Sequence, residues 1–306
     1  MEFFPLLKPC PLPPLPEGES RASARDLQFT GISFIESPRT DYLTFCDKRR
    51  ATLASDPTIR PLVLVLPDFA DWLAALWPAA ELLVVDDPRA TFIDIVEFLQ
   101  RDKLLGQSSL LPASPSISRE AKIGTNAVIE TGVQVDAGVT IGNGSIIHTG
   151  TWVKRGATIS DNCVIGAPGI NVHIGQDGRR RSLPHVAGVI IGETTSLGAG
   201  SVIARGMLTT TTIGNDCILG NLCNIGHSTE LGDDVWVSTG TCIAGVARIE
   251  TGATIALGCV IRDGVRIGAH ASIGMGSVVT KSIGAGVSVF GNPARRIPTV
   301  KAGPSR

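Results

Sequence analysis

The sequence predicts a mainly β protein in which a small α/β domain precedes a left-handed parallel β-helix of about eight coils. Two observations predict the β-helix. An aliphatic residue returns at every sixth position through most of residues 113–284, and a glycine often follows it. A third observation, the mixed strand-like and helix-like texture of residues 17–106, predicts the α/β domain. A chain of 306 residues is long enough for two domains, each with its own core.

The first 16 residues contain six prolines, which deny the backbone its hydrogen-bond donors. An extended, polyproline-like arm is therefore expected for residues 1–16. In the domain that follows, residues 62–66 and 82–85 read as strands, and a helix is expected around Trp72 and Trp77.

The domain should close with an amphipathic helix. Four apolar residues follow the i, i+3, i+4, i+7 spacing that gives a helix one face to bury. They are Phe92, Ile95, Val96 and Leu99.

The repeat runs in register from Ile117 to Ile165 and resumes from Ile191 to Ile203. After a shift of four residues it continues from Ile213 to Val279. Each six-residue repeat is one short strand and one turn, and three repeats make one triangular coil. The 24 repeats therefore predict eight coils, stacked about 4.8 Å apart, with residues 18 apart in sequence lying one above the other.

Two inserts interrupt the repeat, at residues 167–189 and 204–212, and loops of this kind are where solenoids commonly carry function. Residues 285–306 are expected to form a C-terminal tail that contains the sequence GNPAR.

Composition narrows the classes of partner. The net charge of −1, from 27 Lys and Arg against 28 Asp and Glu, gives no general attraction to nucleic acid or anionic membrane. Seven cysteines without a CxxC pair, and an N-terminus unlike a signal peptide, predict a cytoplasmic protein with reduced thiols. No apolar run approaches the roughly 18 residues that a membrane-spanning helix needs, so no transmembrane segment is expected.

The five histidines, at positions 148, 173, 185, 227 and 270, do not form the closely spaced cluster that a zinc site requires, so no metal site is predicted. Acyl transfer needs only one histidine, because a neutral imidazole can take a proton from an amine or hydroxyl that attacks a thioester.

One histidine lies in a recognisable stretch. Residues 221–249, NLCNIGHSTELGDDVWVSTGTCIAGVARI, resemble the catalytic segment of the UDP-3-O-acylglucosamine N-acyltransferases of lipid A biosynthesis. Residues 188–221, GAPGI at 166–170 and GISFIESPRTDYLTF at 31–45 resemble other parts of that family, so the similarity spans about residues 30–275. The resemblance implies a homotrimer that acylates a nucleotide-linked amino sugar for lipopolysaccharide or another surface glycan.

Carried over position by position, the resemblance implies that His227 is the general base, that the Gly245 backbone N–H holds the oxyanion, and that Asn221 is an active-site asparagine. The register agrees for one pair, since Gly245 follows His227 by 18 residues, or one coil. The alternative for His227 is an exposed turn residue.

Candidate substrate-binding residues come from two regions. Phe45 matches the position where the family stacks an aromatic ring on uracil, with a core phenylalanine as the alternative. Arg179, Arg180 and Arg181 suit a nucleotide diphosphate or an acidic carrier protein, with a solvated charge run as the alternative. His185, in the first insert, is also a candidate.

The departures from the family concern the substrates. Lys48 and Ala51 stand where the family has an asparagine and a tyrosine beside uracil, and IRDGVRI at 261–267 lacks a second family histidine. Gly291, Asn292 and Pro293 resemble the closing motif of sugar acetyltransferases that use coenzyme A. The expected co-substrate is therefore acyl-ACP or acyl-CoA, with no permanently bound cofactor. The alternatives are an acetyl-CoA-dependent sugar O- or N-acetyltransferase and an inactive nucleotide-sugar-binding or structural β-helix.

Overall fold

The computed structural model describes residues 4–13, 27–49, 53–102, 104–105 and 115–297, and gives only the backbone of residues 4–8. The chain divides into two compact units. One contains residues 1–109 together with 170–184, and the other contains residues 110–169 and 185–306.

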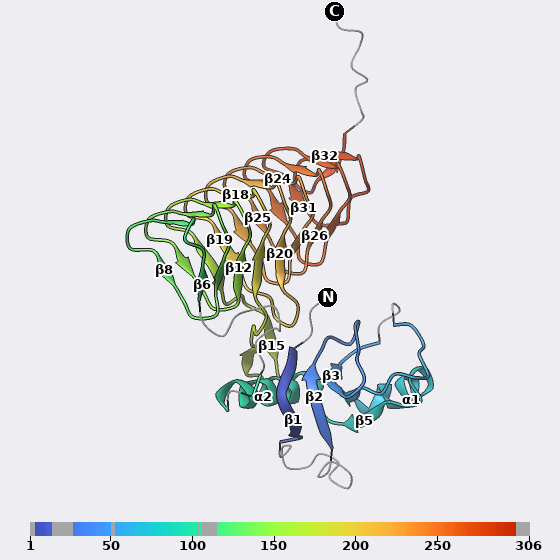
Figure 1. Cartoon of the computed structure of the whole chain (residues 1–306). Coiled ribbons are helices and arrows are strands. Elements are labelled where there is room, and N and C mark those ends of the chain that lie inside the picture. Colours follow the sequence, from blue (N-terminus) through green and yellow to red (C-terminus); the bar gives the residue numbers. More distant parts are fainter. Residues whose placement is uncertain (1–3, 14–26, 50–52, 103, 106–114, 298–306) are drawn as a thin grey trace, which may run out of the picture. The chain divides into compact units, whose positions relative to one another are not determined.

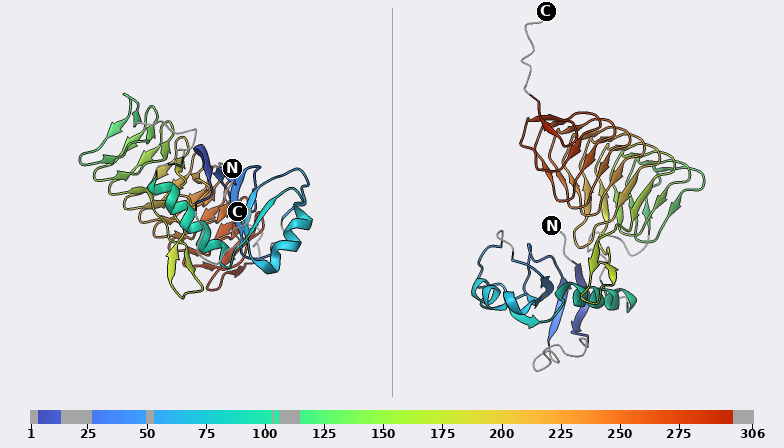
Figure 2. Two further views of the ribbon diagram at one scale, coloured as in Figure 1. Left: turned by 90° about the horizontal axis from the view of Figure 1, so that it is seen from below. Right: turned by 180° about the vertical axis from the view of Figure 1, so that it is seen from behind.

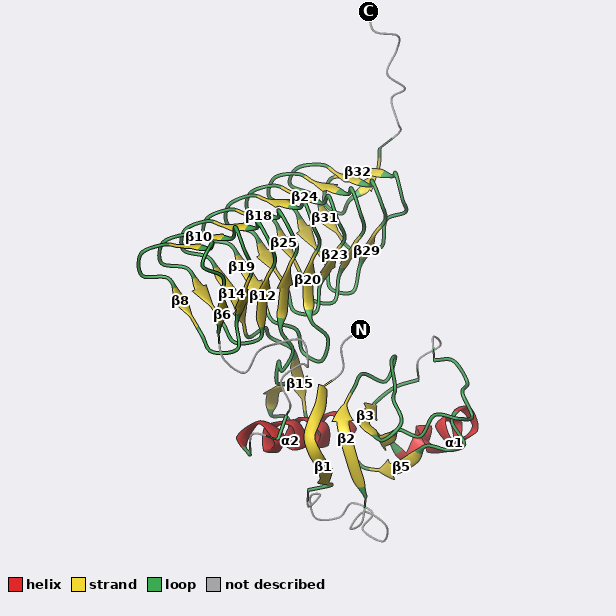
Figure 3. Ribbon diagram, in the orientation of Figure 1, coloured by secondary structure: helices red, strands yellow, loops and turns green. Residues whose placement is uncertain are grey.

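The N-terminal unit is built on a five-stranded sheet with strands in sequence order (Figure 1). The strands are β1 (Phe4–Pro11), β2 (Gln28–Ile32), β3 (Tyr42–Cys46), β4 (Leu62–Val65) and β5 (Glu81–Val84). The helices are α1 (Pro67–Leu76) and α2 (Pro88–Arg101), shown red in Figure 3. Strands β2 to β5 pair in parallel, so α1 and α2 follow the carboxyl ends of β4 and β5.

The expected elements of this unit are confirmed. Both predicted strands form, as β4 and β5, and α1 covers Trp72. All four apolar residues of the predicted amphipathic helix are buried on α2, because the i, i+3, i+4, i+7 spacing turns them to one side.

The predicted polyproline arm is not what the structure shows. Residues 4–11 form β1, which pairs antiparallel with β2. Proline is tolerated there because β1 is the edge strand, and only one side of an edge strand must donate to a neighbour.

The second unit is the β-helix, whose coils stack from β6 to β31 (Figures 1 and 2). Its strands lie on three parallel faces, with eight coil strands each. The first face contains β7 (Lys122–Ile123), β10 (Thr140–Ile141), β13 (Thr158–Ile159), β18 (Ser196–Leu197), β21 (Ile218–Leu219), β24 (Trp236–Val237), β27 (Thr254–Ile255) and β30 (Ser272–Ile273).

The second face contains β8 (Val128–Ile129), β11 (Ile146–Ile147), β14 (Val164–Ala167), β19 (Val202–Ala204), β22 (Asn224–Ile225), β25 (Cys242–Ile243), β28 (Val260–Ile261) and β31 (Val278–Val279). The third face contains β6 (Ser116–Ile117), β9 (Gln134–Val135), β12 (Thr151–Val153), β17 (Val189–Ile191), β20 (Thr211–Ile213), β23 (Glu230–Leu231), β26 (Arg248–Ile249) and β29 (Arg266–Ile267). We call the bend after each face its corner, so that the second corner follows the second face.

The aliphatic residue of each repeat points inward and forms one continuous core along the axis. Residues 18 apart pair on neighbouring coils, as Ile225 does with Ile243. Across the second insert the separation grows to 22, as between Ile203 and Ile225. The predicted class, a left-handed parallel β-helix after a small α/β domain, is confirmed.

The end of the described chain differs from the expected tail. Strand β32 (Ser288–Phe290) pairs in parallel with β30, and β33 (Arg295–Arg296) pairs antiparallel with β32. Val289 continues the inward aliphatic column and is buried in the core, so this segment extends the β-helix.

The first insert contains a hairpin of β15 (Val172–Ile174) and β16 (Arg180–Ser182), which belongs to the N-terminal unit. No helix among the described residues combines the length and apolar character that crossing a bilayer requires.

Candidate active site

Both inserts leave the β-helix at the second corner. The first insert lies between β14 and β17, and the second between β19 and β20. His227 follows β22, so it occupies the same corner. The structure therefore brings the irregular segments of the β-helix to the corner that carries the predicted general base.

Polar side chains form ladders along the other two corners. At the first corner the Asn143 side chain accepts a hydrogen bond from the Thr125 N–H, 2.8 Å away and one coil back. At the third corner Asp233 accepts from the Asn215 N–H at 2.7 Å. These side chains satisfy turn N–H groups that the parallel strands leave unpaired.

At the second corner the corresponding positions carry Arg205, His227, Gly245 and Asp263. Within the described residues, no hydrogen-bond acceptor is found for the Gly245 N–H, although Asp263 is next in the column. A donor without a protein partner is what an oxyanion site requires.

His227 is buried, with 8% of its surface exposed. Burial lowers the pKa of its imidazole below the usual 6.5, and the negative charge of Asp263 partly opposes that shift. The imidazole is therefore neutral at pH 7, the protonation state that a general base needs.

The imidazole of His227 leaves no room for a side chain at Gly245. A Cβ placed on it would lie 2.5 Å from both Cε1 and Nε2 of His227. The Val246 N–H donates to the His227 carbonyl at 2.8 Å, which confirms that the two turns are stacked. The imidazole therefore lies directly over the Gly245 backbone, one coil along the axis.

The first insert supplies two further contacts to the same ring. The ring of His185 meets the ring of His227 edge-on, with 4.9 Å between centroids and 71° between planes. A Cβ on Gly169 would lie 2.8 Å from His185 Nε2 and 3.0 Å from His227 Cβ. Sequence reasoning missed Gly169, whose spacing from His227 does not follow the repeat.

The second insert is held beside this site by Ser228. The Ser228 hydroxyl accepts from the Met207 N–H and donates to the Thr209 carbonyl, both at 3.1 Å. The Ser228 N–H donates in turn to Thr211 Oγ1 at 2.8 Å. The residue after the proposed base thus anchors the loop that packs next to it.

Asn221 is placed elsewhere. It lies at the first corner, where its Oδ1 accepts from the Ala199 N–H at 2.8 Å. This contact belongs to the polar ladder, and Asn221 is one full face away from His227. The structure therefore shows a scaffold contact for Asn221, and the active-site role implied by the resemblance stays a prediction.

Phe45 lies in the core of the N-terminal unit with 6% of its surface exposed. Its ring packs against Phe92 with centroids 5.0 Å apart, and the Arg89 guanidinium lies 5.5 Å from its centroid. These contacts favour the core interpretation of Phe45 over uracil stacking.

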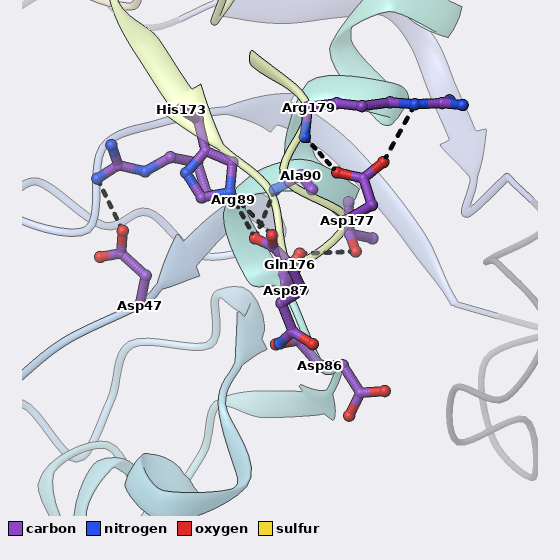
Figure 4. Close-up of polar contacts among 10 residues, drawn as sticks. Asp47, Asp86, Asp87, Arg89, Ala90, His173, Gln176, Asp177 and Arg179 are labelled. Atoms are coloured by element: carbon purple, nitrogen blue, oxygen red, sulfur yellow. Dashed lines mark hydrogen bonds and ion pairs between the residues drawn. The ribbon is translucent and has the colours of Figure 1, made fainter. Parts of the chain in front are cut away.

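The three arginines have different surroundings (Figure 4 shows Arg179). Arg181 forms ion pairs with Asp94 and Glu97 of α2, while Arg179 lies 3.6 Å from Asp177. Arg180 is exposed. Arg181 is therefore used to hold the hairpin, whereas Arg179 and Arg180 face solvent.

Figure 4 also shows a contact that sequence reasoning missed. His173 Nε2 lies 2.9 Å from both carboxylate oxygens of Asp87, the residue that caps α2 through the Ala90 N–H. Hydrogen bonds from Ala90 and His173 keep the pKa of Asp87 low despite its burial. The Gln176 side chain donates to the Asp86 carbonyl and completes the attachment.

Gly291, Asn292 and Pro293 form the turn between β32 and β33, with a cis bond between Asn292 and Pro293. The Gly291 N–H donates to Ser277 Oγ, and its carbonyl accepts from Val278 of β31. Because β32 lies four coils beyond β21, the first-face strand in the coil of His227, this turn is about 19 Å further along the axis than His227.

A family model for the hexapeptide repeat of succinyl-transferase matches residues 210–244 and 246–281. The matched stretches of the β-helix are thus similar to the hexapeptide repeats of that family, and they contain His227 and the residue after Gly245.

Individual proteins that are similar to this chain are named as acyltransferases. A UDP-3-O-acylglucosamine N-acyltransferase of Caulobacter sp. (strain K31) is 33% identical over 132 residues, which cover 43% of this chain and 38% of the relative. An acyl-[acyl-carrier-protein]–UDP-N-acetylglucosamine O-acyltransferase of Pseudomonas paraeruginosa is 33% identical over 109 residues, covering 35% of this chain and 42% of the relative. The match thus spans about two-fifths of either relative, and the resemblance to the N-acyltransferases is confirmed over that part.

Solved structures of similar proteins include LpxA from Acinetobacter baumannii, with a TM-score of 0.44 and 20% identity over 61% of this chain and 72% of that chain. A GDP-perosamine N-acetyl transferase from Caulobacter crescentus, solved with CoA and GDP-perosamine, has a TM-score of 0.24 and 18% identity over 78% of this chain and 69% of that chain.

The role of Asn221 is tested by its replacement. Asn221→Ala should lower the free energy of unfolding by about 1 kcal/mol, because it leaves the Ala199 N–H without its acceptor. Urea denaturation measures the change, and Asn221→Asp, which keeps an acceptor oxygen, is the control. A loss of turnover in Asn221→Ala with unchanged stability would support the active-site role of Asn221 and contradict a purely structural one.

The burial of His227 predicts a pH dependence of stability. The unfolded chain takes up this proton near pH 6.5, whereas the folded chain takes it up only at lower pH. The free energy of unfolding should therefore fall as the pH drops below about 6.5 toward the folded pKa. In urea denaturation between pH 7.5 and 5.5, His227→Gln should show a flatter dependence than the wild type. The exposed His270, replaced by Asn, is the control, and equal slopes for His227→Gln and wild type would contradict the prediction.

Proposed function

We propose that this protein is a thioester-dependent sugar N-acyltransferase. It moves an acyl group from acyl-ACP or acyl-CoA to the amino group of a nucleotide-linked amino sugar, for lipopolysaccharide or another surface glycan. The observation that carries the proposal is a buried, neutral histidine lying over a glycine whose backbone N–H has no acceptor within the described residues.

In the proposed reaction, His227 accepts a proton from the sugar amine as the nitrogen attacks the thioester carbonyl. The carbonyl oxygen becomes an oxyanion, which the Gly245 N–H stabilises by an amount commonly worth about 3 kcal/mol. Collapse of the intermediate forms the amide and breaks the carbon–sulfur bond. The thiolate leaves and receives the proton that His227 holds.

Two features of this chain support particular substrates. Arg179 and Arg180 are exposed cations suited to a diphosphate or to the acidic surface of a carrier protein. The GNP turn at residues 291–293 supports a coenzyme A donor through its resemblance to the acetyltransferase motif. Both donors are cytoplasmic thioesters, so the proposal places the protein in the cytoplasm.

O-acyl transfer is the second candidate, because the Pseudomonas paraeruginosa relative is named an O-acyltransferase and is equally similar. The same base serves a hydroxyl nucleophile as well as an amine. Nucleotide sugars that carry an amine or only hydroxyls, assayed with acyl-ACP and acyl-CoA, distinguish the two reactions.

We also propose that the chain forms a homotrimer through the second face of the β-helix. The outward side chains of this face are mostly apolar, including Val128 and Val260 with 51% and 47% of their surface exposed. The third face instead carries Glu230, Arg248 and Arg266 outward. A flat apolar face of this kind is typical of a subunit interface.

Replacing His227 tests the catalytic proposal. His227→Ala should reduce turnover by about 10²–10⁴-fold, because it removes the proposed general base. Gly245→Ala should also lose activity, since its methyl group would displace the imidazole. Light scattering should show both variants in the wild-type assembly, and near-normal turnover by His227→Ala would end the proposal.

The assembly is tested separately. Size-exclusion chromatography with light scattering should give three times the mass of one chain. Val260→Glu should release single chains, because three like charges would be buried at the interface. Thr254→Glu, on the first face, is the matched control. A single-chain mass for the wild type would contradict the homotrimer.

A further inference from the structure

We propose that His185 is a positioning residue, whose ring holds the imidazole of His227 over Gly245 and keeps water away from it. This inference rests on the proposed role of His227 as the general base. It concerns how that base is oriented.

A histidine base commonly has its second ring nitrogen fixed by a carboxylate or a carbonyl, which sets the tautomer and the tilt of the ring. His227 is different. Its Nδ1 is buried and, within the described residues, makes no hydrogen bond. The orientation of the ring must therefore come from packing.

Three neighbours lie against the side chain of His227. The Gly245 backbone lies against Cε1 and Nε2, and Gly169 lies against Cβ and Cδ2. The third contact is the edge-on ring of His185, with centroids 4.9 Å apart. His185 is the one side chain in this set, since the other two contacts are glycine backbones.

His185 is itself held by a rigid frame. The next residue, Val186, donates its N–H to the Met207 carbonyl at 2.9 Å. Arg205 donates from Nε to the Ala187 carbonyl at 3.0 Å and also bonds the Thr149 carbonyl. Ser228, the residue after His227, anchors the loop that contains Met207. The backbone that supports His185 is therefore hydrogen-bonded to a residue adjacent to His227.

Titratable and charged groups of several elements lie near His227. Asp263 acts on it from two coils along the axis, Arg205 begins the second insert, and His185 touches its ring. The Arg205 guanidinium donates its hydrogen bonds to two backbone carbonyls. Of these three groups, His185 is the one whose ring contacts the ring of His227. Its ring fills space that water would otherwise occupy beside the base.

The experiment is a histidine-labelled NMR titration of the full chain, which follows its five histidines individually. In His185→Ala, water should reach His227, and the pKa of its imidazole should rise toward 6.5. His185→Phe should keep the pKa low, because phenylalanine restores an edge-on ring without a titratable group. His270→Asn is the control and should leave the His227 signal unchanged.

Kinetics supply the second measurement. His185→Ala should lower kcat by about 10- to 100-fold, the usual cost of losing an orienting partner, with a smaller change in KM. In the pH profile of kcat, the acid limb of His185→Ala should move to higher pH, because the pKa of His227 rises in this variant. His185→Phe should recover most of kcat, and His185→Gln, similar in polarity but without a ring, should not.

An unchanged His227 pKa in His185→Ala would overturn the inference, as would full rescue by Gln but not by Phe. If the wild type turns over no sugar acceptor, the proposed function fails, and the NMR titration still decides whether His185 shields and holds His227.

Discussion

The stacking of parallel strands at a fixed separation along the chain is the constraint on which the rest of this molecule depends. Each coil must return its three inward aliphatic residues to the same three columns, since otherwise the backbone hydrogen bonds between coils are lost. Extra residues can enter only by looping out at a corner. Both inserts do so at the second corner, where Gly169, His185 and His227 meet.

The same constraint explains the chemistry of the site. Along the first and third corners, Asn and Asp side chains accept the turn N–H groups. At the second corner His227 and Gly245 occupy the positions that carry the polar ladder at the other corners. A neutral imidazole and the Gly245 backbone N–H therefore lie where the other corners have a side-chain acceptor paired with a turn N–H. Burial in a low dielectric environment lowers the pKa of the His227 imidazole more than the negative charge of Asp263 raises it, and this keeps the ring uncharged.

Periodicity predicted much of this from sequence. The six-residue spacing located the inward aliphatic residues, and the 18-residue coil placed Gly245 over His227 without reference to coordinates. The active-site role of Asn221 was inferred from resemblance and stays a prediction. Its position two residues after Leu219 already indicated, from the sequence, that it lies in the polar ladder of the first corner.

Other features were beyond sequence reasoning because they depend on contacts far apart along the chain. His173 meets Asp87 across 86 residues, and nothing in either local sequence indicates the partner. The sheet partner of the proline-containing strand β1 is likewise set by the tertiary fold, and Phe45 is buried by residues of a helix more than 40 positions later.

The turn that reverses the chain after β32 affects how the molecule behaves in a crowded solution. A solenoid whose last parallel strand lay open would offer an unpaired row of donors and acceptors to any other chain. Here β33 runs antiparallel along that row and presents the exposed Arg295 and Arg296. Like charges on approaching copies repel, so on the first face these arginines disfavour fibril-like growth by end-to-end addition.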